Sequence, residues 1–497
     1  MKCFSSLFFC AVFSGMVAFS AHAAEPSAAV ALVARDAVTL RAAPRESAAA
    51  QTVLWRGEAL EIRAERGDYF QVWSHRLERG GYVQRAQLLR VATGEKSAPE
   101  LAALLGFVSE QPGSETLGFA LAAAAIQAMP AAAIQGPNGA MLLDAIGRQA
   151  ERLGERASMG ALRVKDQAML SAHLDLAHRY GVDFQSIEAG ERVRLCYEGD
   201  AYRRVLAMPA ASAEQQARAA LALTRPECQR VDARPSETEA AKQASADLLD
   251  RVKTEGLAAH WRARLSIRQA MVWSSLAFDR AQRGESNAAR AVADRALTAI
   301  ARVDKADLAD SDLEQYNEAA LRTNAVRWAA QVETAPAAKL AIAVTRQADG
   351  QTCARLSDPR QKSAAPLAER CSWGVVWAAS ASVNREGNAA ALAVQPVDGW
   401  RELWVFRKEA QGWTVQVVPP AALNPGLGYA ELAGWVPGGR QMLVAREAVA
   451  EGRQIRRFEV LDLSTLTPQR TALEPDALGP FTRWPDPAWK RDSLALR

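Results

Sequence analysis

The sequence predicts a multidomain protein with a small all-β domain first, an α-helical middle of stacked antiparallel helices, and an antiparallel β domain at the carboxyl end. Its 497 residues exceed what one hydrophobic core normally organises, so several domains are expected. Short alternating apolar runs with turn residues occur near both ends, and a long alanine-rich region with strong helix formers lies between them. These observations together define the expected fold class.

The composition is that of a globular protein, with 49% apolar and 23% charged residues. The formal net charge is only +4, and basic and acidic residues are interspersed along the whole chain. No dense basic stripe is present, so the sequence does not indicate a nucleic-acid partner.

The first residues have the pattern of a secretory signal peptide. Lys2 gives a positive start, an apolar stretch runs from Leu7 to Phe19, and Ala21-His22-Ala23 supplies small residues for a peptidase. We therefore expect a signal peptide over residues 1–23, cleavage near Ala23, and a mature protein in the periplasm or outside the cell. The alternative is an uncleaved anchor, for which the apolar stretch is short. No transmembrane segment is expected in the mature chain.

Four cysteines remain after the predicted leader is removed, which fits an exported protein with disulfides. Four cysteines allow three pairings, which sequence alone does not separate. Proximity along the chain favours two local bonds, each worth about 3 kcal/mol by loop closure. The expected pairs are Cys196–Cys228 and Cys353–Cys371. The alternatives are four unrelated thiols or a zinc site, the latter disfavoured because no C-x-x-C pair is present.

Residues 33–91 read as short strands separated by turns, and such strands can remove their exposed edges by closing into a barrel. The order of V-T-L-R-A-A-P at 38–44, R-G-E-A-L-E-I at 56–62, D-Y-F-Q-V at 68–72 and G-Y-V at 81–83 resembles the bacterial SH3-like family. The resemblance implies an SH3-like barrel and binding of cell-wall peptidoglycan or peptide segments. Phe70 and Tyr82 stand where that family usually has tryptophan, so its groove chemistry is not carried over.

Three aromatic residues of this domain are candidate binding residues. Tyr69, Trp73 and Tyr82 are able to form a stacking surface for a sugar or a peptide. The alternative is that they fill the core and rim of a small barrel, where aromatic residues supply much of the buried area.

Residues 96–342 are rich in alanine, leucine, arginine and glutamate, and proline and glycine divide them into helix-sized lengths. Ser311 and Glu314 have capping-box spacing, which predicts a helix start there. The interval near 268–300 resembles one tetratricopeptide-type helical hairpin, with Trp273 on its first helix and Gly284 at its turn. The region is expected either to offer a concave binding face or to act as a plain helical spacer.

Residues 371–497 change to period-two alternation with glycine-bearing turns, which predicts an antiparallel meander. The interval 432–463 resembles a β-propeller blade, but the region is too short for the roughly four blades that close a ring. We therefore expect an incomplete propeller or a sandwich. The cluster from Trp484 to Trp489 is expected to be a tail that packs over the sheet.

No recognisable catalytic motif is present, and no catalytic residue, cofactor or metal ligand is assigned. His173 and His178 are five residues apart, which separates them by about 140° on a helix and does not favour a shared zinc ion. A cysteine peptidase would have to use Cys196 or Cys228 with His260, although both cysteines are better placed for pairing.

Two functions follow as expectations. The first is an exported, non-enzymatic envelope protein that binds peptidoglycan or an envelope protein through the SH3-like and helical regions. The alternative is a cell-wall-acting hydrolase whose carboxylates the sequence does not reveal.

Overall fold

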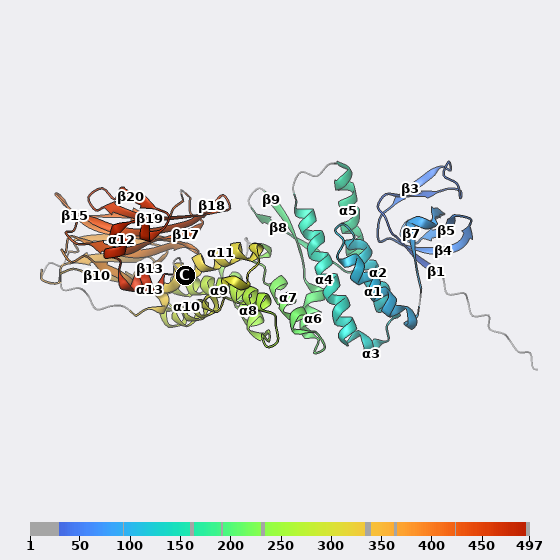
Figure 1. The fold of residues 1–497 in the computed structure, drawn as a ribbon, viewed down its shortest axis with the longest axis horizontal. Coiled ribbons are helices and arrows are strands. Elements are labelled where there is room, and N and C mark those ends of the chain that lie inside the picture. Colours follow the sequence, from blue (N-terminus) through green and yellow to red (C-terminus); the bar gives the residue numbers. More distant parts are fainter. Residues whose placement is uncertain are drawn as a thin grey trace, which may run out of the picture. The chain divides into compact units, whose positions relative to one another are not determined.

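The computed structural model describes residues 29–92, 94–159, 164–189, 192–229, 234–332, 339–361, 365–422 and 424–493. The predicted signal peptide lies outside these residues. The chain divides into two compact units, which Figure 1 shows in sequence colours. The first unit holds Met1–Pro130 with Ala161–Gly181, and the second holds Ala131–Gly160 with Val182–Arg497.

The first unit begins with an antiparallel sheet of seven strands in the order β3-β2-β6-β5-β4-β1-β7 (Figure 1). Its strands are β1 (Ala29–Val33), β2 (Val38–Arg41), β3 (Ala50–Leu54), β4 (Ala59–Arg66), β5 (Tyr69–Ser74), β6 (Arg79–Gln84) and β7 (Leu88–Val91), with the short helix η1 (Arg85–Gln87) before the last. Phe70, Val72 and Val83 belong to its core, because they alternate with outward residues along β5 and β6. Among the described strands no ladder joins β3 to β7, so the pairings show a small sheet rather than the closed barrel expected from the sequence.

Three helices complete the first unit, although the sequence pattern grouped them with the helical middle. They are α1 (Ala98–Ser109), which follows η2 (Glu95–Ser97), α2 (Glu115–Ala128) and α5 (Val164–Arg179). The turn between β3 and β4 holds them to the sheet, because Thr116 Oγ1 donates to Arg56 O at 2.7 Å and the Tyr180 hydroxyl donates to Gly57 O at 2.8 Å. Gly57 has φ +88°, and a Cβ there would lie 2.5 Å from the Thr116 backbone, so this approach requires glycine.

A buried ionic contact fastens α5 to the same sheet. His173 is fully buried, and its Nε2 lies 2.7 Å from Asp36 Oδ1. Burial alone would raise the pKa of Asp36, but the hydrogen bond and charge of His173 and the charge of Arg56 hold it below its usual value. The Asp36 carboxylate therefore stabilises the joint between helix and sheet.

The second unit starts with helices and one β-hairpin. Its helices are α3 (Ala131–Ile134), α4 (Pro137–Ser158), α6 (Asp200–Ala207), α7 (Ala213–Leu223), α8 (Pro235–Arg251), α9 (Ala259–Gln282), α10 (Ser286–Ala301) and α11 (Asp310–Val326), with η3 (Pro226–Cys228), η4 (Lys305–Asp307) and η5 (Arg327–Ala330). The hairpin consists of β8 (Phe184–Ala189) and β9 (Arg192–Tyr197). The hairpin lies in a region expected to be helical, and that prediction is wrong here, because residues around Ile187 and Leu195 alternate with period two inside the alanine-rich region.

Helices α9 and α10 form the hairpin expected near 268–300. Gly284 makes its turn with φ +82°, and Trp273 and Ala296 are buried in the core shared by the helices. Helix α11 begins at Asp310 with Ala309 as its N-cap, so the capping box expected at Ser311 is not formed. Asp312 instead accepts a hydrogen bond from Arg264 Nε of α9 at 3.0 Å, and this tertiary ion pair fixes the first turn.

Two sheets follow in the second unit. The smaller has the order β10-β11-β12 and contains β10 (Ala341–Arg346), β11 (Thr352–Ser357) and β12 (Ala368–Ser372). The larger has the order β13-β14-β15-β17-β18-β19-β20, with β16 paired to β15. Its strands are β13 (Val375–Val383), β14 (Ala389–Val397), β15 (Trp400–Glu409), β16 (Gly412–Val418), β17 (Leu427–Val436), β18 (Gln441–Ala450), β19 (Arg453–Asp462) and β20 (Pro468–Ala472). The pairing of β15 with β17 is parallel, so the sheet is mixed rather than the expected antiparallel meander.

The carboxyl-terminal segment packs over this sheet, as the sequence analysis expected. It contains η6 (Pro475–Ala477), α12 (Gly479–Arg483) and α13 (Pro487–Asp492). Trp489 and Phe481 are buried against Phe458 of β19, with the three rings meeting edge to face. Within the described residues, no helix has the length and apolar character that a membrane crossing requires.

A buried ionic cluster joins α11 and η5 to the larger sheet. Glu431 of β17 accepts hydrogen bonds from Arg401 of β15, at 2.7 Å, and from Arg327 of η5. Asn324 of α11 donates to the same carboxylate at 3.3 Å. Burial would raise the pKa of Glu431, but the two guanidinium charges hold it below its usual value. The cluster therefore fixes the helical layer on the sheet through charge as well as packing.

Candidate functional site

The three aromatic residues predicted as binding residues lie on one face of the sheet in the first unit. In the β5–β6 ladder, Tyr69 is opposite Gln84, Gln71 is opposite Tyr82, and Trp73 is opposite Gly80. Residues 69, 71 and 73 point to the same side because side chains alternate along a strand. The core residues of these strands occupy the other side. The structure thus places the three aromatic residues on the same face of the ladder, opposite Phe70, Val72 and Val83.

Their exposure differs. Tyr69 is only 8% exposed and its hydroxyl accepts a hydrogen bond from Gln84 at 3.3 Å, whereas Trp73 and Tyr82 are half-buried. Arg63 of β4 places its guanidinium 4.4 Å from the centre of the Trp73 ring. A Cβ at Gly80 would be 3.2 Å from that ring, so the absent side chain leaves room for the indole. We refer to Trp73, Tyr82 and Arg63, with Tyr69 at the edge, as the aromatic face.

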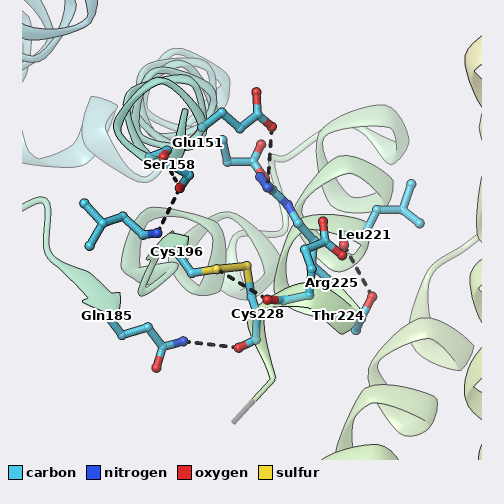
Figure 2. The surroundings of a disulfide bond; sticks show 12 residues. Glu151, Ser158, Gln185, Cys196, Leu221, Thr224, Arg225 and Cys228 are labelled. Carbon is cyan, nitrogen blue, oxygen red and sulfur yellow. Dashed lines mark hydrogen bonds and ion pairs between the residues drawn. A yellow bond between two sulfur atoms is a disulfide. The ribbon is translucent and has the colours of Figure 1, made fainter. Parts of the chain in front are cut away.

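The second unit contains a pocket of about 530 Å³ beside a disulfide. Figure 2 shows the surroundings of that disulfide. Helix α4, the β8–β9 hairpin, α6, α7 and α8 surround it. Its wall combines small apolar residues with charged ones: Glu151, Gln185, Tyr197, Glu198, Gly199, Tyr202, Arg203, Ala222, Leu223, Arg225, Cys228, Gln229, Glu237, Thr238, Ala241, Ala244, Ser245 and Leu248. This volume suits a small molecule or a short peptide segment.

The disulfide Cys196–Cys228 ties the hairpin to the helices beside this pocket. It joins β9 to η3 across a Cα–Cα distance of 5.8 Å, and Cys196 is buried. Figure 2 shows two further ties: Gln185 Nε2 donates to Cys228 O at 3.5 Å, and the Ser158 hydroxyl of α4 accepts from the backbone N–H of Leu195 at 2.9 Å. The hairpin is therefore anchored on both of its strands.

A carboxylate at the pocket wall is fully engaged. Glu151 accepts hydrogen bonds from Arg225 at one oxygen and from the Tyr202 hydroxyl, at 2.7 Å, at the other. The pKa of Glu151 is above its usual value, because burial raises it by more than the Arg225 charge and the Tyr202 hydrogen bond lower it. Burial likewise raises the pKa of Tyr197 to about 12. Glu151, Arg225 and Tyr202 are hydrogen-bonded to one another, so their role in this structure is to fix the shape of the pocket wall.

The second predicted pair, Cys353–Cys371, is also bonded in the structure. The two cysteines face each other across β11 and β12, with a Cα–Cα distance of 4.0 Å. Glu369 lies close to both sulfur atoms. The sulfurs are bonded to each other, so this group does not offer thiolate ligands for a metal ion.

Three of the described histidines, His75, His173 and His260, lie beside acidic or aromatic side chains. His173 serves the joint with Asp36, exposed His75 lies 2.9 Å from Glu61, and the ring of His260 lies 5.4 Å from that of Trp261. Both cysteines that the sequence offered as partners of His260 are in the Cys196–Cys228 disulfide.

Sequence reasoning did not find the pocket around the first disulfide. Its wall comes from several separate elements, and only their packing brings Glu151 and Arg225 together across 74 positions of sequence. The available local signals were the period-two run of β9 and Gly199, which has φ +88° at the start of α6.

Comparison of the chain with protein-family models, with curated proteins and with solved structures gave no match.

Proposed function

We propose that this protein is an exported, non-enzymatic component of the cell envelope that binds a cell-wall polymer through the aromatic face of its first unit. The observation that carries the proposal is the position of Trp73 and Tyr82 on one face of the β5–β6 ladder, with the buried Tyr69 at the edge of that face. Phe70, Val72 and Val83 form the core on the other face of these strands. Flat rings beside an arginine suit the stacking of sugar rings or peptide groups.

The proposal includes an SH3-like identity for this domain. Support comes from the order of the motifs at 38–44, 56–62, 68–72 and 81–83, each of which falls on a described strand or turn of the small sheet. A role of the helical region in binding an envelope protein remains part of the same proposal.

Export is supported by the two disulfides, which persist in oxidising compartments such as the bacterial periplasm. We propose residues 1–23 as the leader, on the basis of their sequence pattern. Amino-terminal sequencing of the protein recovered from the periplasm should begin at Ala24. A cytosolic protein that retains Lys2 would overturn this part of the proposal.

Co-sedimentation of the full mature chain with purified, insoluble peptidoglycan tests binding directly. We expect the wild type to sediment at low salt and Trp73→Ala or Tyr82→Ala to bind more weakly. Each stacked ring contributes about 1 kcal/mol, which corresponds to roughly a fivefold change in Kd. Trp484→Ala is the matched control, because that tryptophan is 46% exposed in the other unit. Equal sedimentation of all variants would show that the aromatic face is not the binding site.

The alternative function is a cell-wall hydrolase, and one observation favours it. Three carboxylates, those of Glu151, Glu198 and Glu237, line the pocket beside the first disulfide. A pair of carboxyl groups is what most glycoside hydrolases use. Release of soluble fragments from peptidoglycan by the wild type, lost in Glu198→Gln, would support hydrolysis. Failure of the wild type to release fragments from acidic to alkaline pH would reject it.

A further inference from the structure

A second pocket, of about 350 Å³, lies in the second unit between the α9–α10 turn, η5 and strands β10, β11 and β13. It is distinct from the aromatic face and from the pocket at the first disulfide. Its wall is formed by Ala281, Gly284, Ser286, Ala289, Arg290, Trp328, Ala329, Gln331, Val344, Arg346, Thr352, Val375, Val376, Trp377, Ala378 and Ala379. We refer to it as the arginine–tryptophan pocket.

The charged side chains that line this pocket are all positive. It contains Arg290 and Arg346 and no acidic side chain. Arg290 has no hydrogen-bond or ion-pair partner among the described residues, and Arg346 donates to the backbone carbonyl of Gln282. Glu285, the N-cap residue of α10, accepts a hydrogen bond from Arg283 at 2.8 Å. The pocket therefore keeps an uncompensated positive charge, which favours an anion.

The rest of the wall is apolar and aromatic. Trp377 donates its indole N–H to Gln395 at 3.2 Å, so its ring is fixed. The ring of Trp328 also lines the pocket, and its indole nitrogen is buried. The wall thus suits a ligand with an apolar body.

An exposed tryptophan marks the rim. Trp373 is 61% exposed, and both its ring and the Arg346 guanidinium lie 3.9 Å from the position of a Cβ at Gly350. Gln282 connects the same two residues, because its carbonyl accepts from Arg346 and its amide donates to the Trp373 carbonyl at 3.4 Å. Exposed aromatic residues beside an arginine are typical of binding sites.

The second disulfide holds this rim in place. In the three-stranded sheet, Arg346 is opposite Thr352, and Thr352 is opposite Ser372. The Cys353–Cys371 bond links the positions immediately after Thr352 and before Ser372. It therefore fixes the strands that carry the arginine, the threonine and the start of the tryptophan loop.

We propose that the arginine–tryptophan pocket binds a small organic carboxylate with an apolar body, with the carboxylate at Arg290 and Arg346 and the body against Trp328 and Trp377. Two guanidinium groups suit a carboxylate because they donate charge-assisted hydrogen bonds to its oxygens. The volume of about 350 Å³ accommodates a ligand of the size of an acylated amino acid.

Titration of the full mature chain with N-acetylphenylalanine tests this proposal, with the uncharged N-acetylphenylalanine amide as the comparison probe. Tryptophan fluorescence and calorimetry report binding. We expect the acid to bind in a saturable manner and the amide to bind about tenfold more weakly, the change that corresponds to roughly 1.4 kcal/mol. Equal affinity for acid and amide, or no saturable binding of the acid, would overturn the proposal.

Two variants locate the site. Arg290→Gln should weaken binding of the acid and leave the affinity for the amide unchanged, because Arg290 is exposed and makes no contact that the fold needs. Arg302→Gln, at the other end of α10, is the matched control and should bind as the wild type does. If Arg302→Gln weakens binding as much as Arg290→Gln, the effect is one of net charge and the assignment of the pocket is wrong. This test does not involve the aromatic face, so its outcome is independent of peptidoglycan binding.

Discussion

Replacement of Glu431 by glutamine tests whether the buried ionic cluster stabilises the second unit. Glu431 is 1% exposed, Arg401 is 0% exposed and Arg327 is 3% exposed, so none of the three charges is compensated by solvent. The substitution keeps the size and shape of the side chain. It removes the only negative charge that contacts the two guanidinium groups in the described cluster.

The magnitude follows from the geometry. Arg401 Nη2 lies 2.7 Å from Glu431 Oε2. With the charge centres about 4 Å apart and an effective dielectric constant of about 20, one pair contributes roughly 4 kcal/mol. Removal of one partner of a buried pair typically costs about 3–5 kcal/mol, because the remaining charge stays desolvated. We therefore expect Glu431→Gln to lower the free energy of unfolding of the second unit by about 3–5 kcal/mol.

Urea unfolding of the oxidised protein, followed by tryptophan fluorescence, measures the change. Glu402→Gln is the matched control, because Glu402 is a neighbour of Arg401 on β15 but is half-buried and has no ion-pair partner among the described residues. It should change the unfolding free energy by less than about 0.5 kcal/mol. If Glu431→Gln unfolds at the same urea concentration as Glu402→Gln, the cluster does not hold the helical layer on the sheet by charge.

Three further predictions concern contacts that connect secondary-structure elements within each unit. Replacement of Cys196 and Cys228 by serine should lower the free energy of unfolding by about 4 kcal/mol, from loop-closure entropy over 32 residues, as measured by urea unfolding. Gly57→Ala should destabilise the first unit by about 1–3 kcal/mol more than Gly67→Ala in thermal unfolding, because both have positive φ but only Gly57 touches the backbone of α2. Asp36 has a pKa below that of the unfolded chain, so its stabilising contribution is present above about pH 4 and is lost as the pH falls through the folded pKa. Acid titration of wild type and Asp36→Asn should show a smaller loss in the variant.

Local patterns in the sequence were sufficient for several elements. Strand β5 (Tyr69–Ser74) lies within residues 33–91, which were predicted to form short strands because apolar runs alternate with turn residues there. The hairpin of α9 and α10 was predicted because Gly284 interrupts two helix-forming lengths. The two cysteine pairs were predicted from proximity along the chain, and both are bonded in the structure.

Local patterns failed where tertiary contacts decide the conformation. The β8–β9 hairpin lies in an alanine-rich region, so composition over a long window concealed two short alternating strands. The start of α11 is set by the ion pair of Asp312 with Arg264, which is 48 positions away, rather than by a cap at Ser311. The parallel contact of β15 with β17 arises because β16 leaves the main path of the sheet.

The sequence by itself determined the order of the all-β, helical and β regions, and proximity along the chain favoured the two disulfides. These features depend on the spacing of residues within short segments of the chain, and the sequence shows that spacing directly. Only the tertiary structure decided that Arg290 and Arg346 line one pocket and that Arg327 and Glu431 share one buried cluster. Their proximity results from the packing of helices against sheets over many residues, so no short segment of the chain contains it.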